Sequence, residues 1–552
     1  MGKTCQMKVA KARNDNTALQ QADSWIRRLF FATFGSIIIL LLFFSSTDHF
    51  LKVDHRLSNG LMLVLGLVAA SIGYLLFRIL ARLVDSHNAQ LLHKLQGRWT
   101  VIFASVLLIS VQLMIALSIM FKTGWDAGTV FDFAYKKVDN QLADYSRYFS
   151  LYPNNLFLAW LYVRIIRLHQ TIFGSLSLHG CIFALIVLNS AVSGATAILV
   201  YRVIKLLTKS SLMAWLGWIG YALVVGFSPW FLIPYSDALG ILFPILMLYL
   251  YTRPTRNESV RWMLIGACAY IGFRIKPTTA ILLIAILSVE LVASIGRMPD
   301  WRRVLRAAAL FITTLVLLQA SYALLMVPSL GLTLNKEKSM GPVHFIKMGL
   351  NDETDGVFLD EDVQFSESFE SKGAQNAANF KVIKDRLDDF GFQGYGEFLT
   401  RKALVNFNNG SFGWGAEGSF VVMPVNRSTR ATHHLMSYYY PFGEDHHLFL
   451  TVSQVLWLMV LFGAFLLGFN RKYPSLREQK IIAAIRLSLI GLVVYVMLFE
   501  ARARYLYTFL PIFLVAALVG FQWFRAATGV HLVQWIRYTP PQKTKALPIS
   551  DF

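Results

Sequence analysis

The chain has 552 residues, of which 55% are hydrophobic and only 15% charged, and its mean hydropathy is +0.50. Soluble domains carry about 25% charged residues, so this composition excludes a water-soluble multidomain protein. The net charge of +20 comes from Lys and Arg in short connectors between apolar runs, which is the positive-inside pattern of membrane proteins and not a nucleic-acid-binding surface. We therefore expect an all-α polytopic membrane protein with no nucleic-acid partner.

Twelve apolar runs approach the length of about 17–25 residues that a membrane-spanning helix needs. We expect spans near 29–47, 61–83, 100–121, 179–203, 211–227, 236–252, 261–274, 278–296, 305–327, 449–469, 481–499 and 503–524. The basic head, 1–28, is followed by no cleavage site and predicts an uncleaved anchor. The first two spans occupy 29–99, the membrane core 100–330 and 448–525, and the tail 526–552.

The segment 156–168 predicts an interfacial helix and not a thirteenth span. Its thirteen residues would give about 20 Å of helix, and Arg164 and Arg167 share one face opposite apolar residues. With twelve spans, most Lys and Arg residues of the connectors fall on the cytoplasmic side if both termini are cytoplasmic. The sequence thus predicts a multi-pass protein of the cell membrane with two long extracytoplasmic segments, 122–178 and 331–447. The second should fold as a mixed α/β or irregular cap.

Asp126 follows the third predicted span almost directly. A carboxylate beside Trp125 and close to lipid would have its pKa raised into the range of a general base. Alternatively, Asp126 caps the helix that the following apolar periodicity predicts. We expect Asp132, Asp139 and Asp144 on the solvated face of this segment.

Two pairs of cations stand at predicted outer boundaries, where cations are usually scarce. Arg274 and Lys276 precede a proline that starts the next helix, which favours an anion site of phosphate size. Arg502 and Arg504 could clamp a phosphate or pair with Glu500, which could instead accept hydrogen bonds from sugar hydroxyls. The alternatives are snorkelling side chains for the first pair and a self-contained ion cluster for the second.

Other polar and aromatic residues give weaker signals. Asp237 either caps the sixth span or faces the same compartment as Asp126. The paired histidines of the long segment lack a matching carboxylate spacing, so a divalent metal is possible but not indicated. Several aromatic residues there could stack on sugar rings or pack in a core. These two groups are His433, His434, His446 and His447, and Phe412, Trp414 and Tyr438 to Tyr440.

Five short motifs, in this order and on one predicted side of the membrane, carry a resemblance. They are WDAG at 125–128, YPNN at 152–155, YSD at 235–237, RIKP at 274–277 and EARARY at 500–505. Over about 101–524 the chain resembles the GT-C superfamily of integral-membrane glycosyltransferases, which includes the protein O-mannosyltransferases. More narrowly, YPNN and PVHFIKMGL at 342–350 resemble a set of Gram-positive bacterial membrane proteins.

The resemblance implies an inverting transfer of a sugar from a polyprenyl-phosphate donor to an envelope glycan, glycolipid or protein acceptor on the extracytoplasmic face, among membrane lipids and with no cofactor required. Asp126 would deprotonate the acceptor hydroxyl. The donor phosphate would be held by Arg274, Lys276, Arg502 and Arg504. Asp237, Glu500, Tyr152, Asn154, Asn155 and His344 would line the substrate site. Many relatives carry a second acidic residue where this chain has Ala127, so Asp126 would work alone or with Asp237.

Three other functions remain open. A transporter or flippase of a lipid-linked saccharide would share the anion sites, but the predicted spans carry little charge at mid-membrane, which disfavours it. An oligosaccharide ligase would take a whole glycan from a lipid diphosphate. A non-catalytic scaffold of an envelope complex would not need Asp126.

Overall fold

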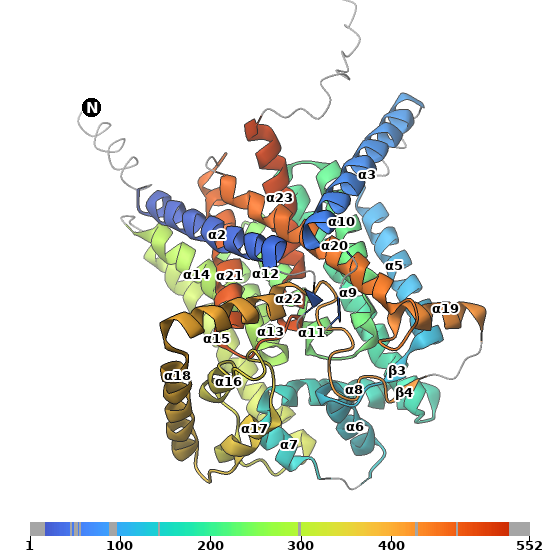
Figure 1. Cartoon of the computed structure of the whole chain (residues 1–552), viewed down its shortest axis with the longest axis vertical. Coiled ribbons are helices and arrows are strands. Elements are labelled where there is room, and N and C mark those ends of the chain that lie inside the picture. Colours follow the sequence, from blue (N-terminus) through green and yellow to red (C-terminus); the bar gives the residue numbers. More distant parts are fainter. Residues whose placement is uncertain are drawn as a thin grey trace, which may run out of the picture.

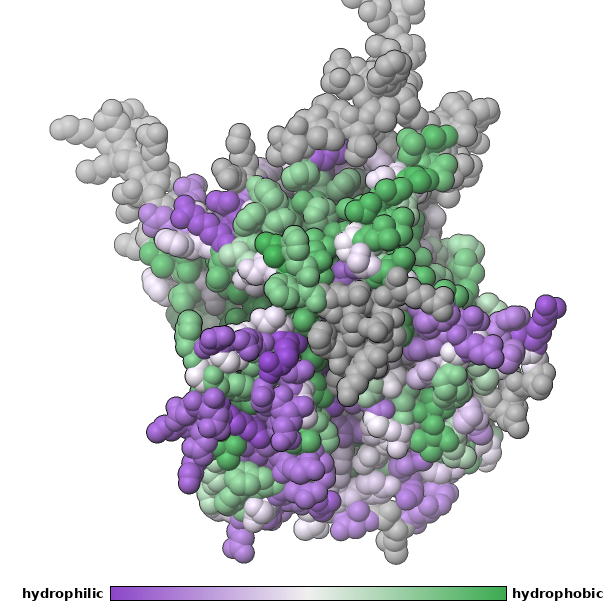
Figure 2. All heavy atoms as spheres, viewed as in Figure 1, coloured by the Kyte–Doolittle hydropathy of each residue, from purple (hydrophilic) through white to green (hydrophobic). Residues whose placement is uncertain are grey.

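The computed structural model describes residues 17–44, 47–48, 53–54, 57–87, 97–141, 144–295, 300–424, 429–470 and 473–528. Most of the predicted basic head and nearly all of the tail therefore lie outside the described residues. The described part is mainly helical. Figure 1 shows α2, α3 and α23 at one end of the molecule and α6, α7, α16 and α17 at the other. Figure 2 shows apolar side chains gathered over the first end and hydrophilic ones over the second.

The helices follow one another with short connections. In chain order the described α-helices are α2 (Thr17–Phe44), α3 (Asn59–His87), α5 (Arg98–Ile119), α6 (Asp126–Val138), α7 (Ser146–Leu151), α8 (Leu156–Phe173), α9 (Leu178–Thr208), α10 (Ser211–Tyr221), α11 (Ser236–Gly240), α12 (Leu242–Thr252), α13 (Glu258–Ile275), α14 (Ala280–Ser294), α15 (Trp301–Ser321), α16 (Pro342–Met348), α17 (Asp360–Glu367), α18 (Lys372–Phe407), α19 (Arg430–Tyr439), α20 (His446–Leu466), α21 (Leu476–Leu498), α22 (Arg504–Tyr507) and α23 (Leu510–Thr528). Within α18 the backbone bends at Gly391, where φ is 56°.

Two short antiparallel pairs complete the described secondary structure. β1 (Thr47–Asp48) pairs with β2 (Val53–Asp54). β3 (Phe121–Lys122) pairs with β4 (Met423–Pro424), so that Phe121 lies opposite Pro424. The second pair joins the segment before α6 to the long segment before α19, and it fixes two parts of the chain that are 300 residues apart against each other.

Nine helical segments among the described residues are long and apolar enough to cross a membrane. They are Ala18–Phe44, Asn59–Leu76, Trp99–Ile119, Pro153–Phe173, Leu178–Thr208, Pro277–Ser294, Trp301–Leu330, His446–Phe469 and Leu476–Leu498, and shorter apolar helices cover Ser211–Gly226, Ser236–Thr252 and Leu510–Ala526. Eleven of these twelve segments overlap predicted spans. The predicted span at 261–274 is helical, as part of α13, but is not among them, so the count of twelve stays a prediction.

Helix α8 differs from the expectation in length. It continues to Phe173, five residues beyond the predicted end, and at this length it qualifies by size and composition as a candidate span. Its amphipathic character is confirmed, because Arg164 and Arg167 are exposed while Tyr162 and Ile166 on the other face are buried. The predicted length is too short because the helix continues through the polar residues 169–171, which interrupt the apolar run.

Long-range packing centres on α9, which contacts α5, α10, α12 and α23. Helix α20 packs on α23, and α13 packs on α15. The three largest buried side chains, Trp230, Trp414 and Trp457, come from separate parts of the chain and share one apolar core. This core supports the segments that carry the polar residues described below.

The long segment, here called the connector domain (described residues 331–424 and 429–447), is helical. It contains α16 to α19, β4 is its one described strand, and irregular stretches lie between the helices at 349–359 and 408–422, so the segment is helical and irregular and not the expected mixture of helices and strands. Its interior holds a buried polar group in which Asp362 accepts hydrogen bonds from Arg386 at 3.0 and 3.1 Å and pairs with Lys347 at 3.2 Å. Burial opposes ionisation, but Arg386 and Lys347 hold the pKa of the Asp362 carboxyl below its usual range.

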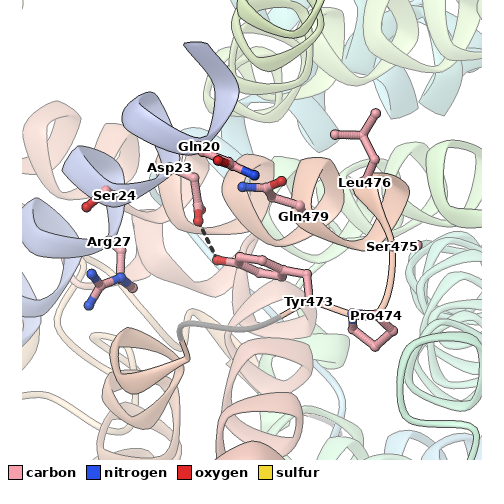
Figure 3. Close-up of a pocket in the computed structure, with 9 residues that line it drawn as sticks. All are labelled: Gln20, Asp23, Ser24, Arg27, Tyr473, Pro474, Ser475, Leu476 and Gln479. Carbon is pink, nitrogen blue, oxygen red and sulfur yellow. Dashed lines mark hydrogen bonds between the residues drawn. The ribbon is translucent and has the colours of Figure 1, made fainter. Parts of the chain in front are cut away.

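Two ion pairs join apolar helices to one another. In α21, Arg486 is fully buried, and its guanidinium donates to Asp23 of α2 at 3.1 Å and to the Tyr473 hydroxyl at 2.6 Å. Glu290 of α14 pairs with Lys480 of α21 at 2.8 Å. Beside the first pair lies a pocket of about 520 Å³, shown in Figure 3, between α2 and the start of α21. None of the predicted site residues lines this pocket.

Candidate functional site

Asp126 is the first residue of α6, and the chain reaches it through a tight turn. A Cβ on Gly128 would lie 2.0 Å from the Thr123 carbonyl oxygen, so only glycine permits this approach. Trp125 holds the N-cap position, and no side chain caps the helix. The expected alternative that Asp126 caps the helix is therefore wrong, and its carboxylate is available for other contacts.

The Asp126 carboxylate meets a network of hydroxyl and amide groups. Tyr148 of α7 donates to Asp126 Oδ1 at 3.0 Å and accepts from Asn155 Nδ2 at 2.7 Å. The Tyr235 hydroxyl lies 3.4 Å from both Asp126 Oδ2 and Asn155 Oδ1. Burial raises the pKa of Asp126, and the nearby Arg504 charge and the Tyr148 hydrogen bond offset this only in part. A carboxyl in this setting is suited to exchange protons.

Two further residues of the YPNN motif lie beside this network. Exposed Asn154 donates to Asn155 Oδ1 at 3.3 Å. The Tyr152 ring packs against that of Tyr148, with centroids 5.4 Å apart. The structure thus brings Tyr152, Asn154 and Asn155 to the neighbourhood of Asp126, as the sequence predicted.

Asp237 and Lys276 form a buried ion pair. Lys276 Nζ donates to Asp237 Oδ1 at 2.6 Å, and both residues are nearly inaccessible to solvent. Asp237 lies inside the first turn of α11 and does not cap it, which removes the capping alternative. Lys276 also lies over the Tyr505 ring, 4.5 Å from its centroid. The pair therefore borders the segment that carries the second set of cations.

That segment, between α21 and α22, is rich in charge. Glu500 accepts from Arg502 Nε at 3.0 Å and from the Tyr505 hydroxyl at 2.9 Å. Burial raises the pKa of Glu500, but the charges of Arg502 and Arg504 outweigh this and hold it below the usual range. The Arg504 guanidinium lies 4.7 Å from the Trp125 ring centroid, beside Asp126.

A carboxylate that the sequence analysis missed joins both arginines. Glu417 Oε2 lies 3.4 Å from Arg502 Nη1, and Glu417 Oε1 lies 3.3 Å from Arg504 Nη1. Glu417 follows a glycine-rich stretch with no helical pattern, and no motif marked it. Together these side chains form a charged cluster of seven residues: Asp126, Asp237, Lys276, Glu417, Glu500, Arg502 and Arg504.

Several buried polar atoms around this cluster have no hydrogen-bond partner in the described part of the chain. They include Arg504 Nε, Trp125 Nε1 and Asp237 Oδ2. Buried polar atoms of folded proteins are normally paired with protein, water or ligand. Arg504 Nε and Trp125 Nε1 are donors on stacked side chains beside Asp126. A ligand with acceptor oxygens, such as a phosphate or a sugar, would satisfy both.

The structure does not bring every predicted residue into this cluster. Arg274 donates to the Tyr270 hydroxyl at 3.0 Å and to Gln319 of α15, and it stacks on Tyr322 at 4.0 Å. These contacts account for a cation at this position, so no phosphate is needed to explain it. Its expected place beside Lys276 is wrong because Arg274 is still in α13, whereas the helix has ended at Lys276.

His344 is also elsewhere, in the interior of the connector domain. Its Nδ1 lies 2.8 Å from Ser366 Oγ, and burial lowers its pKa to about 4. Three of the expected aromatic platforms are core residues, since Phe412, Trp414 and Tyr440 are at most 1% exposed, whereas Tyr438 is partly buried. The described residues contain no group of three His, Cys, Asp or Glu side chains able to hold a metal ion.

The connector domain holds the cationic segment in place through its backbone. Asn406 of α18 accepts from the Arg502 N–H at 3.0 Å and donates to the Val496 carbonyl at 3.1 Å. The Gly356 carbonyl accepts from the Ala501 N–H at 2.7 Å. Lys402 is fully buried, donates to the Gly349 carbonyl, and has its pKa lowered to about 7 by burial. Such partners 100 residues away leave no local sequence signal.

These features define an integral membrane protein with a buried, charged site between its apolar helices and a helical connector domain. The chain belongs to the family described as conserved hypothetical integral membrane protein, whose model matches residues 19–524. No curated protein matches the chain.

Proposed function

We propose that this protein is a glycosyltransferase that moves a sugar from a polyprenyl-phosphate carrier to a cell-envelope acceptor, with inversion at the anomeric carbon. The observation that carries the proposal is the pairing, in one buried cluster, of a carboxyl with a raised pKa, Asp126, and a guanidinium with an unpartnered donor atom, Arg504. Base and anion site are the two elements that such a transfer requires.

In this reaction Asp126 accepts the proton of the acceptor hydroxyl as its oxygen attacks the anomeric carbon of the sugar. The bond between that carbon and the phosphate oxygen breaks, and the electron pair leaves with the phosphate. Arg502 and Arg504 stabilise the charge that grows on the leaving phosphate. No nucleotide is consumed, because the phosphate ester supplies the driving force.

Tyr148, Asn155 and Tyr235 would orient the Asp126 carboxylate through the hydrogen bonds described above. Lys276 adds a positive charge near the donor phosphate and is fixed by Asp237. Asn154 and Tyr152 lie where an acceptor would approach. We place the site on the extracytoplasmic face, with both termini cytoplasmic, because this arrangement puts most connector cations inside.

The test uses the purified full-length chain in detergent, with a panel of radiolabelled polyprenyl-phosphate sugars and crude envelope acceptors. We expect label transfer by the wild type and a loss of at least 100-fold in Asp126→Asn, the usual scale for a lost general base. Asp132→Asn is the matched control, because Asp132 lies on the same helix but pairs with Lys122 at 2.8 Å, outside the cluster.

Equal transfer by wild type and Asp126→Asn would refute Asp126 as the base. Transfer from lipid diphosphates alone would indicate an oligosaccharide ligase. If folded wild type transfers no label but moves a labelled lipid-linked saccharide across a vesicle membrane, the protein is a flippase.

A further inference from the structure

Glu417 is the carboxylate of the charged cluster that lies within 3.4 Å of both Arg502 and Arg504, and it stands in a glycine-rich turn. It follows Phe412, Gly413 and Gly415, which all have positive φ. Its side chain is only 9% exposed. The neighbouring backbone is fixed, since the Ser419 carbonyl accepts from the Gly124 N–H at 2.8 Å. Displacement of Glu417 from the arginines would therefore be a movement of its side chain and not of this backbone.

The contacts of Glu417 are looser than those of the other carboxylates in the cluster. Its distances of 3.3 and 3.4 Å exceed the 2.7–2.9 Å usual for a charged N–H···O hydrogen bond. Glu500 lies closer to Arg502, at 3.0 Å, and Asp237 lies 2.6 Å from Lys276. Arg504 Nη1 and Nε both lack a hydrogen bond of good geometry within the described residues. This is unusual because Arg504 is only 8% exposed, so bulk water does not replace the missing partners. Arg504 thus lies near the Glu417 carboxylate while two of its guanidinium nitrogens have no hydrogen-bond partner in the described part of the chain.

We propose that Glu417 stands in the place of the donor phosphate and that the donor binds by displacing it from Arg502 and Arg504. This inference rests on the proposed function and adds the residue that the donor phosphate must displace. A carboxylate and a phosphodiester each present two oxygens that share one negative charge, so one can replace the other between two guanidinium groups. The buried donors Arg504 Nε and Trp125 Nε1 would gain acceptors in the exchange.

The charge of the cluster favours a donor with a single phosphate. Its four carboxylates face three cations, which gives a net charge of −1 when all are ionised. Exchange of Glu417 for a phosphodiester keeps this value. A diphosphate would add one more negative charge to a buried site, which is costly. The geometry therefore favours a monophosphate-linked carrier over the diphosphate of an oligosaccharide ligase.

The test measures binding of a C55 polyprenyl methyl monophosphate, a phosphodiester with one negative charge, and of the matching methyl diphosphate to full-length protein in detergent, by thermophoresis. We expect Glu417→Gln to bind the monophosphate about tenfold more tightly than the wild type, because the competing charge is gone. Glu397→Gln is the control, since Glu397 is an exposed residue of the same connector domain that accepts from Gln393. It should leave the affinity unchanged. The wild type should prefer the monophosphate.

Other outcomes separate this inference from the proposed function. If the wild type binds the monophosphate and Arg504→Gln loses binding, but Glu417→Gln binds equally or more weakly, displacement is refuted and the transferase proposal stands. If neither lipid binds to any variant, both fail. Preference for the diphosphate refutes the donor class. Should Glu417→Gln not fold, Glu417→Asp, whose shorter arm reaches the arginines less well, must also bind the monophosphate more tightly.

Discussion

Replacement of Tyr148 by Phe tests the electrostatic control of Asp126. It removes the hydrogen bond that the Tyr148 hydroxyl donates to Asp126 Oδ1 at 3.0 Å and leaves the ring in place. A hydrogen bond to a charged group contributes about 1.5–3 kcal/mol, and one pKa unit corresponds to about 1.4 kcal/mol. Because Tyr235 can donate in its place, we expect the pKa of Asp126 to rise by about one unit.

The assay is the pH dependence of kcat/KM for sugar transfer. A base must be ionised, so activity is lost as pH falls through the pKa of Asp126, which burial already holds above that of an ordinary aspartate. In Tyr148→Phe the acid limb should move to higher pH by about one unit, while the rate on the alkaline side changes little.

Tyr145→Phe provides the control, because Tyr145 precedes the same helix but packs on Phe133 and beneath Lys136, away from Asp126. Its acid limb should match the wild type. An unchanged or lowered limb in Tyr148→Phe, with normal folding, would refute the reasoning that this hydroxyl favours the ionised carboxylate.

Three further predictions concern stability, measured by thermal unfolding in detergent. Asp237→Asn leaves the Lys276 ammonium buried without its counter-ion and should lower the free energy of unfolding by about 3–5 kcal/mol. The double variant Asp237→Leu with Lys276→Met should restore most of this loss, and an equal loss in the single and double variants would contradict the pairing. Asp23→Asn should lower the Tm because Arg486 keeps its charge in the apolar interior, and an unchanged Tm would show that α2 is held otherwise. Lys402→Met should raise the Tm more at pH 6 than at pH 9. The pKa of Lys402 is about 7 in the folded protein and higher in the unfolded chain, so the wild type is least stable below pH 7, where the buried ammonium is charged, and its stability rises above pH 7. An equal gain at both pH values would refute the shift.

The apolar helices were predicted well because the signal for each one, a long run of apolar residues, lies within the helix itself. Eight of the nine candidate spans overlap predicted ones. The errors arose where local composition is ambiguous. The end of helix α8 was predicted five residues too early, before the polar residues 169–171, and the connector domain is rich in Gly, Asn and aromatic residues that obscured its helices.

The candidate site was predictable where a charge stands at an unusual place in the chain. Asp126, Lys276 and Arg504 met this condition, and the structure brings them together. Arg274 met it as well, yet Gln319 and Tyr322 engage it, which spacing could not show. Glu417 could not be predicted, because its role depends only on folding against arginines about 90 residues further along the chain.

The pairing of Asp126 with Arg504 also has a consequence for biosynthesis. The two residues stand at opposite ends of the site-forming sequence, and the arginine half also needs the connector domain between them, which supplies Glu417 and anchors the Arg502 backbone. At about 5–20 residues per second, the ribosome takes roughly 20–75 s to pass from one to the other. In a nascent chain, Asp126 is therefore synthesised long before Arg502 and Arg504, the residues of the proposed anion site. Unfinished or truncated chains should be inert towards the carrier lipid, and activity should arise only when the last helices enter the membrane.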